Sequence, residues 1–168
     1  MAEDTYRVGI LTLSDKGSCG EREDESGSLL AELVAGLGNV IRYQVIADDQ
    51  DKIILMLKSW VDDLHLDLIL TTGGTGLSPR DVTPQATAAV LDYQVPGMAE
   101  AMRAESLNKT PRAMLSRALA GIRQKTLIIN LPGSPKAARE NFEVLLPVLS
   151  HALAKLNGDP TDCAIADE

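Results

Sequence analysis

Cysteine, aromatic residues and positive charge are all scarce in this chain of 168 residues. Its two cysteines, Cys19 and Cys163, lie in polar stretches near opposite ends, so neither a disulfide framework nor a cysteine metal site is expected. With 16 Lys and Arg against 24 Asp and Glu, the net charge of −8 argues against nucleic acid or an anionic membrane surface as a partner. Any phosphate-binding site must therefore be a local exception to the overall charge.

Long hydrophobic runs are also lacking. No stretch approaches the length of a membrane span, and the first residues do not contain the apolar core of a secretory signal, so we expect a cytoplasmic protein. The low aromatic content fits an α/β protein whose core is built from Leu, Ile, Val and Ala. The length suits a single domain, residues 1–157, followed by an acidic tail, residues 158–168, that we expect to be mobile.

Short apolar runs alternate with amphipathic segments along the chain. This alternation predicts a three-layer α/β/α fold with a mostly parallel sheet. Polar residues alternate with apolar ones in the second strand, which is therefore expected at a sheet edge, and residues 109–124 fit either a helix or short extended pieces. The predicted strands are Val8–Leu13, Val40–Ile46, Leu66–Leu70 and Thr126–Leu131, and the predicted helices are Ser26–Leu37, Asp51–Leu64, Pro84–Asp92, Pro96–Leu107 and one beginning at Pro135.

A glycine-rich loop follows the third predicted strand. Gly73, Gly74 and Gly76 let the backbone turn sharply and leave its N–H groups open to a bound group. Thr83 is expected to cap the next helix, with Pro84 at the first helical position. Because the unpaired N–H groups of a helix start attract anions, the loop indicates a phosphate-binding site.

The loop does not match the common nucleotide-binding motifs. The glycines are not followed by Lys-Ser or Lys-Thr, as in a Walker A loop, and their spacing is not that of a dinucleotide-binding fold. The cation that a polyphosphate requires must then come from Arg80 or from a metal held by Asp81. A tight strand-to-helix turn with a solvated Arg80–Asp81 pair is the alternative interpretation.

Polar residues follow each of the predicted strands directly. Ligands of open α/β sheets bind outside the carboxyl ends of the strands, so these residues are expected to meet at one binding site. The four clusters are Ser14-Asp15, Asp48-Asp49, the glycine-rich loop with Asp81, and Asn130 with Pro132-Gly133-Ser134.

The string TTGGTG-x-x-x-RDVTP, residues 71–84, resembles the signature of the molybdopterin-binding domain family. Within that family, the RDVTP form is similar to that of the molybdopterin adenylyltransferases. The resemblance extends over residues 7–156 and includes TLSD at residues 12–15, PG at residues 96–97 and NLPGSP at residues 130–135.

The resemblance implies adenylyl transfer from Mg-ATP to the terminal phosphate of molybdopterin, with release of pyrophosphate. Carboxylates prefer hard cations, so Asp48 and Asp81 are the predicted Mg²⁺ ligands and catalytic residues. The predicted phosphate and nucleotide contacts are Ser14, Asp15, Gly73, Gly74, Thr75, Gly76 and Arg80, and the predicted pterin contacts are Asn130, Pro132, Gly133 and Ser134.

Other interpretations of these residues remain open. Asp48 and Asp15 suit local turns, Asp81 suits the charge preference of a helix start, and Ser134 suits a helix cap. The chain as a whole could be a binding or assembly protein that holds the pterin without transferring adenylate, or a generic nucleotide or flavin binder. The resemblance also implies a homotrimer and a possible partnership with the molybdenum-inserting protein of the pathway.

Overall fold

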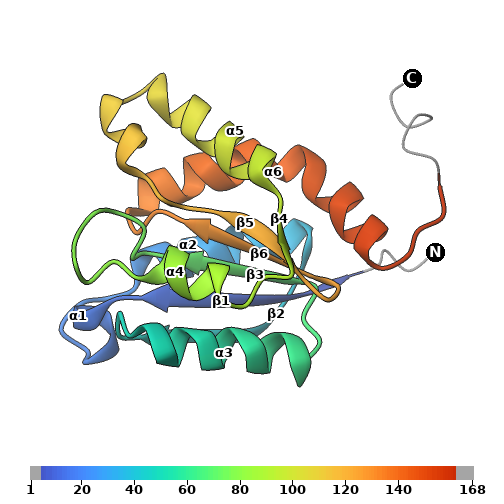
Figure 1. Ribbon diagram of the computed structural model, residues 1–168, viewed down its shortest axis with the longest axis horizontal. Coiled ribbons are helices and arrows are strands. Elements are labelled where there is room, and N and C mark those ends of the chain that lie inside the picture. Colours follow the sequence, from blue (N-terminus) through green and yellow to red (C-terminus); the bar gives the residue numbers. More distant parts are fainter. Residues whose placement is uncertain (1–4, 162–168) are drawn as a thin grey trace.

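A computed structural model describes residues 5–161 of the chain. Cys163 and most of the predicted acidic tail lie outside the described residues. Six strands form one sheet in the order β2-β1-β3-β6-β5-β4 (Figure 1). The four strands from β2 to β6 are parallel, whereas β5 runs antiparallel to β6 and β4 antiparallel to β5. The strands are β1 (Tyr6–Leu13), β2 (Gly38–Ile46), β3 (Leu68–Thr72), β4 (Tyr93–Gln94), β5 (Ala120–Arg123) and β6 (Thr126–Leu131).

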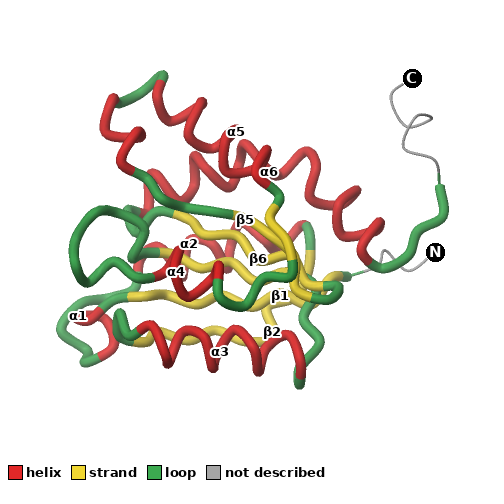
Figure 2. The backbone as a smooth tube through the Cα atoms, in the orientation of Figure 1, coloured by secondary structure: helices red, strands yellow, loops and turns green. Residues whose placement is uncertain are grey.

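Helices cover both faces of the sheet and complete three layers (Figures 1 and 2). One face packs against α2, α5 and α6, and the other against α3 and α4. No helix of residues 5–161 has the length and apolar character needed to cross a membrane. The helices are α1 (Asp15–Ser18), α2 (Glu25–Leu33), α3 (Gln50–Asp62), α4 (Thr83–Ala88), α5 (Pro96–Leu107) and α6 (Pro135–Leu156), with two 3-10 turns, η1 (Val34–Gly36) and η2 (Pro111–Leu115).

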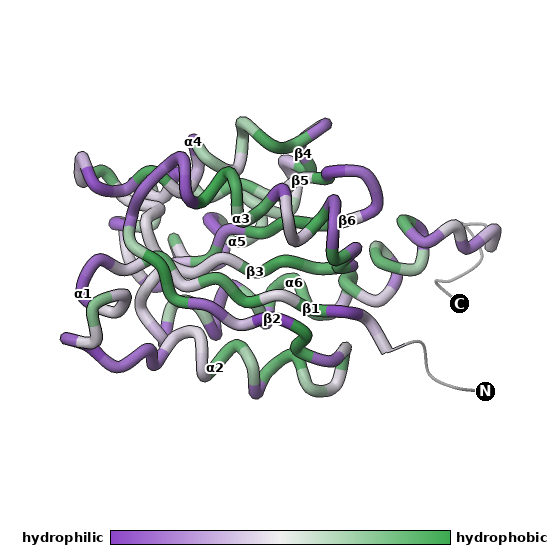
Figure 3. Tube along the Cα trace, turned by 90° about the horizontal axis from the view of Figure 1, so that it is seen from below, coloured by the Kyte–Doolittle hydropathy of each residue, from purple (hydrophilic) through white to green (hydrophobic). Residues whose placement is uncertain are grey.

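The two sides of the core follow from the alternation of side chains along the strands. In β1, Val8 and Ile10 contribute to the cluster beneath α2 and α6, while Leu11 and Leu13 contribute to the cluster beneath α3. The predicted three-layer fold with a mostly parallel sheet is confirmed, as is the edge position of β2, which stands at one end of the strand order and pairs with β1. Figure 3 shows hydrophobic residues along the central strands and hydrophilic residues in the loops near α1.

The single tryptophan of the chain packs on the sheet. Trp60, on α3, is 2% exposed and sits over Gly9 of β1. A Cβ on Gly9 would lie 2.7 Å from the indole ring, so only glycine admits the ring at this position. The contact fixes the distance between α3 and the sheet near the amino ends of the strands.

Two predicted boundaries near the glycine-rich loop are wrong. β3 starts two residues later than predicted because the Leu66 N–H donates to the Trp60 carbonyl and keeps Leu66 in the turn after α3. α4 is shorter than predicted, since the chain leaves the helix and the Asp92 N–H donates to the Ile122 carbonyl of β5.

The predicted capping role of Thr83 is also wrong. Thr83 is itself the first residue of α4, which places Pro84 second. Its hydroxyl donates to the Gly73 carbonyl at 2.9 Å instead of accepting from the helix. α4 therefore begins without a side-chain cap, and Thr83 ties the helix to the glycine-rich loop.

The start of α2 also differs from the prediction, and the structure decides between the two interpretations of residues 109–124. α2 begins at Glu25, because the carboxylate of Asp24 accepts from the Gly27 N–H and caps the helix one residue earlier than predicted. Residues 109–124 form η2 and then β5, so the choice that includes short extended pieces is the correct one.

Candidate active site

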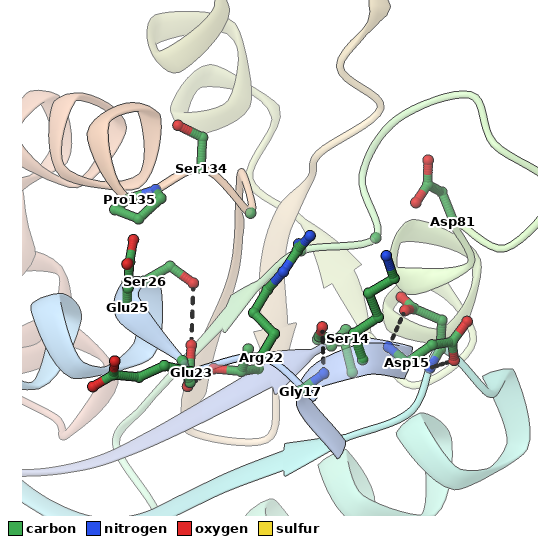
Figure 4. A pocket seen from close by; sticks show the side chains of 18 residues that line it. Ser14, Asp15, Gly17, Arg22, Glu23, Glu25, Ser26, Asp81, Ser134 and Pro135 are labelled. Atoms are coloured by element: carbon green, nitrogen blue, oxygen red, sulfur yellow. Dashed lines mark hydrogen bonds between the residues drawn. The ribbon is translucent and has the colours of Figure 1, made fainter. Parts of the chain in front are cut away.

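The carboxyl ends of the parallel strands open into a cavity of about 660 Å³. Its walls come from the end of β1 with α1, the segment of residues 22–26, the glycine-rich loop and the start of α6. Figure 4 shows Ser134 and Asp81 on opposite sides of this cavity, with the side chain of Arg22 extending between them. The site lies where the strand directions predict it.

The structure brings eight of the predicted site residues to this cavity. These are Ser14, Asp15, Asp48, Gly73, Gly74, Asp81, Gly133 and Ser134. Thr75, Gly76 and Pro132 instead line a second cavity of about 270 Å³ beyond the glycine-rich loop. Arg80 and Asn130 line neither cavity.

Asn130 lies inside the sheet layer and is fully buried. Its side-chain amide donates to the hydroxyls of Thr71 and Thr87, both at 2.9 Å, and its oxygen accepts from the Leu119 N–H at 3.3 Å. With both donors and the acceptor satisfied inside the protein, Asn130 links β3, α4 and β6 beneath the cavity instead of facing into it.

The glycine-rich loop turns through two residues of positive φ, Gly73 at +99° and Gly74 at +66°. A Cβ on Gly73 would collide with the Leu13 carbonyl, and one on Gly74 would collide with the Thr83 hydroxyl and lie 2.8 Å from Asp48 Oδ1. Glycine is therefore required here for both conformation and space. The loop passes close enough to β1 and Asp48 to form a wall of the cavity.

The carbonyl groups of the loop are held by the protein. Thr83 donates to Gly73 and Gly74 through its hydroxyl and its N–H, and the Arg117 N–H donates to Thr75 at 3.0 Å. Within residues 5–161, the N–H groups of Gly74, Thr75 and Gly76 have no hydrogen-bond partner. Such a run of unpaired N–H groups is suited to an anion.

Two aspartates, Asp15 and Asp48, form a linked network with Arg80 beside the loop, and Asp81 lies close to it. The Arg80 guanidinium donates twice to the Asp15 carboxylate, at 2.9 and 2.7 Å. The Asp15 carboxylate also accepts from the Asp48 N–H, and the Asp15 N–H donates to Asp48 Oδ2 at 3.2 Å. Asp81 accepts from the Ser78 N–H at 2.9 Å.

The two linked carboxyls of this network are shifted in opposite directions. The hydrogen bond from Arg80 lowers the pKa of Asp15. Burial, followed by the negative charge of Asp15, raises the pKa of Asp48, and Asp81 adds to this repulsion. Among the described residues, Asp48 Oδ1 is buried without a hydrogen-bond partner. The ligand-free site therefore holds a carboxylate whose negative charge is incompletely compensated.

A comparison with protein-family models assigns residues 9–151 to the family described as "Probable molybdopterin binding domain". The chain belongs to this family. The family predicted from the glycine-rich loop is thus confirmed, and it covers most of the described residues.

Named relatives and solved structures of this domain are similar over most of the chain. The molybdopterin biosynthesis enzyme MoaB of Thermus thermophilus is 53% identical with a TM-score of 0.87, covering 94% of this chain and 100% of that one. The molybdopterin adenylyltransferase of Helicobacter pylori J99 is 42% identical over 92% of this chain and 90% of its own. Gephyrin of Dictyostelium discoideum is 44% identical over 94% of this chain, which spans only 23% of gephyrin.

The buried oxygen of Asp48 makes this molybdopterin-binding domain suitable for a divalent cation. A cation near Asp48 and Asp81 would supply the missing partner and offset the repulsion between them. Within residues 5–161 no cluster of three or more His, Cys, Asp or Glu side chains could hold a metal. Mg²⁺ is typically held by one or two carboxylates together with water and substrate phosphates.

Stability measurements can test the electrostatic strain at Asp48. A carboxyl whose pKa is raised by folding contributes most to stability below its unfolded pKa, and this contribution is lost as pH rises through the folded pKa. Asp48→Asn should therefore raise the Tm of the metal-free chain at pH 7, by about 2 °C after allowance for solvent screening, and change it little near pH 3.

The neighbouring Asp49 provides the control for this measurement. Its carboxylate caps α3 and lies 3.8 Å from the Lys52 ammonium, so Asp49→Asn should not raise Tm at pH 7. Thermal unfolding in the presence of a chelator measures both variants. A lower Tm for Asp48→Asn at pH 7 would contradict the interpretation.

Among the cavity-lining residues that sequence reasoning missed are Lys16, Arg22 and Asp24. Lys16 and Arg22 bring positive charge to it without an ion-pair partner among residues 5–161, whereas Arg80 is paired with Asp15. Asp24 accepts hydrogen bonds from the hydroxyls of Thr12 and Tyr43. Burial, followed by the hydrogen bond to Asp24, raises the pKa of Tyr43 to about 12. All three lie in a charged stretch that shows no periodicity, and only the capping position of Asp24 gives a local signal.

Proposed function

We propose that the chain is a molybdopterin adenylyltransferase that transfers AMP from Mg-ATP to the terminal phosphate of molybdopterin and releases pyrophosphate. The observation that carries the proposal is the cavity on which the glycine-rich loop, with the unpaired N–H group of Gly74, lies beside two carboxylates, Asp48 and Asp81. The unpaired N–H groups of Thr75 and Gly76 continue the loop toward the second cavity. The name of the Helicobacter relative, of which the chain covers 90%, supports the same activity.

The reaction forms a bond between a terminal phosphate oxygen of molybdopterin and the α-phosphorus of ATP, and breaks the bond from that phosphorus to the bridging oxygen. Two anionic substrates must therefore be held together, so positioning and charge compensation supply most of the catalysis. In our proposal the N–H groups of Gly74, Thr75 and Gly76 bind phosphate oxygens, while Lys16 and Arg22 neutralise negative charge.

Mg²⁺ would supply further charge neutralisation on the phosphates. We assign it to Asp48 and Asp81, whose carboxylates lie near enough for Asp81 to raise the pKa of Asp48. The guanidinium of Arg80 stays beside the cavity because Asp15 holds it there through two hydrogen bonds. Ser14 is assigned to a phosphate contact, although its hydroxyl also accepts from the Gly17 N–H and caps α1.

We assign the pterin to the turn that follows β6. Gly133 and Ser134 line the main cavity, and Pro132 lines the neighbouring one, so this turn separates the two. Ser134 also accepts from the Ala137 N–H as the cap of α6, which fixes its orientation. Asn130 would contribute from below, by holding β6 in place through its buried amide.

We further propose that the protein is cytoplasmic and acts as a homotrimer, as the family resemblance implies. A partnership with the molybdenum-inserting protein of the pathway is consistent with the length of gephyrin, of which this chain matches about a quarter. Sedimentation of the purified chain tests the trimer directly.

Turnover with molybdopterin and Mg-ATP tests the proposed activity. Pyrophosphate and an adenylylated pterin should appear in equal amounts and only when both substrates are present. Retained pterin binding without either product would favour the alternative, a binding or assembly protein of the same family.

A further inference from the structure

Arg117 contacts the glycine-rich loop from outside the main cavity. It lies half-buried between η2 and β5, in the segment whose structure the sequence left open. Its guanidinium donates from Nε to the Gly76 carbonyl at 2.8 Å and from Nη2 to the Asp81 carbonyl at 2.7 Å. Its backbone N–H donates to the Thr75 carbonyl at 3.0 Å. One residue thus makes three hydrogen bonds to the loop.

The two carbonyls bound by the guanidinium flank a short exposed segment, residues 77–80, which we call the excursion. Residues 77–80 are exposed, whereas Gly76 and Asp81 are partly buried on either side of them. The two ends lie close together, since a Cβ on Gly76 would be 2.9 Å from Asp81 Oδ2. Arg117 therefore joins the ends of the excursion to each other and to the body of the protein.

Arginine is suited to this task in a way that lysine is not. A guanidinium presents several N–H groups in one rigid plane and is always charged, so it can bind two carbonyls at once. Hydrogen bonds from a charged donor are also stronger than those between neutral groups. A lysine ammonium on its flexible stem could reach one of the carbonyls but could not reproduce the planar pair.

We propose that Arg117 is a positioning residue for adenylyl transfer: by fixing the carbonyls of Gly76 and Asp81, it holds the Asp81 carboxylate in place for the substrates. Arg117 itself is absent from the lining of the main cavity and acts through the loop. This inference rests on the proposed function for its catalytic consequence, but its effect on the loop can be measured without any substrate.

Two variants and one control test the proposal. Arg117→Ala removes both guanidinium bonds, and Arg117→Lys retains the charge with at most one of them. Arg123→Ala is the control, because Arg123 also forms two hydrogen bonds with one partner, Asp62, and a third to the Val90 carbonyl, at the far end of β5. All three variants lose a partly buried arginine fork, but only the two Arg117 variants affect the loop.

The first measurement is amide hydrogen exchange in the ligand-free protein. Exchange at Ser78, Asp81 and Thr83, whose N–H groups are hydrogen-bonded within the excursion or to the loop, should accelerate at least tenfold in Arg117→Ala and less in Arg117→Lys, and should stay at the wild-type rate in Arg123→Ala. The second measurement is turnover. Misplacing Asp81 should lower kcat about 100-fold in Arg117→Ala and roughly tenfold in Arg117→Lys. The Mg²⁺ concentration for half-maximal turnover should also rise.

A double variant separates a positioning role from a merely structural one. Because Arg117 acts through Asp81, Arg117→Ala added to Asp81→Asn should cost less than about threefold in kcat beyond the single Asp81 variant. A full additional 100-fold loss would overturn the proposal, as would unchanged loop exchange or a wild-type kcat in folded Arg117→Lys. A wild-type protein without transferase activity would refute the proposed function alone, and the exchange data would still decide whether Arg117 fixes the loop.

Discussion

Asp81→Asn is expected to reduce turnover roughly 100-fold or more, the scale for removing one electrostatic catalytic group. The substitution preserves the shape of the side chain, and the remaining oxygen can still accept from the Ser78 N–H. The substitution removes the negative charge of the carboxylate that we propose as a Mg²⁺ ligand. Pterin affinity should be nearly unchanged, because we assign the pterin to the turn after β6. Steady-state turnover and pterin binding measured on the same preparation separate the two effects.

Asp92→Asn is a matched control for this substitution. Asp92 also accepts one backbone N–H, that of Gln124 at 2.7 Å, and it lies away from the cavity. Its turnover should stay close to that of the wild type. If Asp81→Asn under saturating substrates also stays within about threefold of the wild type, Asp81 is not catalytic.

A double-mutant cycle extends this prediction to Asp48. If Asp48 and Asp81 serve one centre, the double variant Asp48→Ala/Asp81→Ala should lose little more turnover than either single variant. Residues that act as a unit are strongly non-additive. Additive losses in activation free energy, within roughly 0.5 kcal/mol, would mean that the two carboxylates act at different places. The raised pKa of Asp48, caused in part by Asp81, makes coupling the expected result.

Gly74→Ala should strongly destabilise the protein through the glycine-rich loop. Positive φ at a residue with a Cβ costs about 1 kcal/mol, and the collisions with Thr83 and Asp48 should bring the loss of unfolding free energy to roughly 2–4 kcal/mol. Chemical denaturation measures this loss. In the fraction that remains folded, ATP affinity should fall because the loop can no longer approach Asp48.

Gly20 provides a control that separates the cost of positive φ from the cost of the collisions. It has a positive φ of +80°, but a Cβ there would meet no atom within 4 Å. Gly20→Ala should therefore lose only the conformational part, about 1 kcal/mol, with ATP affinity retained. Equal losses at the two positions would show that the tight packing around Gly74 has no energetic importance.

The parallel part of the sheet could be predicted from sequence because β1, β2, β3 and β6 each carry their own signal, whereas the short antiparallel strands β4 and β5 carry none that identifies them. β3 and β6 are rich in apolar residues and buried on both faces, as covered parallel strands are, and β2 carries polar residues at alternate positions, Arg42 and Gln44, and is largely exposed, as suits an edge strand. The direction of parallel strands then brings their carboxyl ends together, which is why Ser14, Asp48 and Asp81 could be assigned to one site.

The hydrogen bonds that shape the site could not be predicted in the same way. Thr83 is a residue type that caps helices, and only the three-dimensional position of Gly73 explains why its hydroxyl turns toward the loop. Arg117 follows Asp81 by 36 residues, in a segment without clear periodicity. Asn130 lies near the end of a strand, where the sequence predicts a ligand contact, but its amide donates to the buried hydroxyls of Thr71 and Thr87. Contacts between distant segments leave no local pattern in the sequence.

The packing of Trp60 over Gly9 gives the chain an intrinsic fluorescent reporter of folding. As the only indole, and one that is 2% exposed, Trp60 should emit at short wavelength in the native protein and shift to longer wavelength when α3 separates from the sheet. The ring lies near the amino ends of the strands, away from the cavity at their carboxyl ends, so nucleotide or pterin should not displace it. Its emission spectrum can thus follow the unfolding of every variant in the presence of either substrate, without an added dye or label.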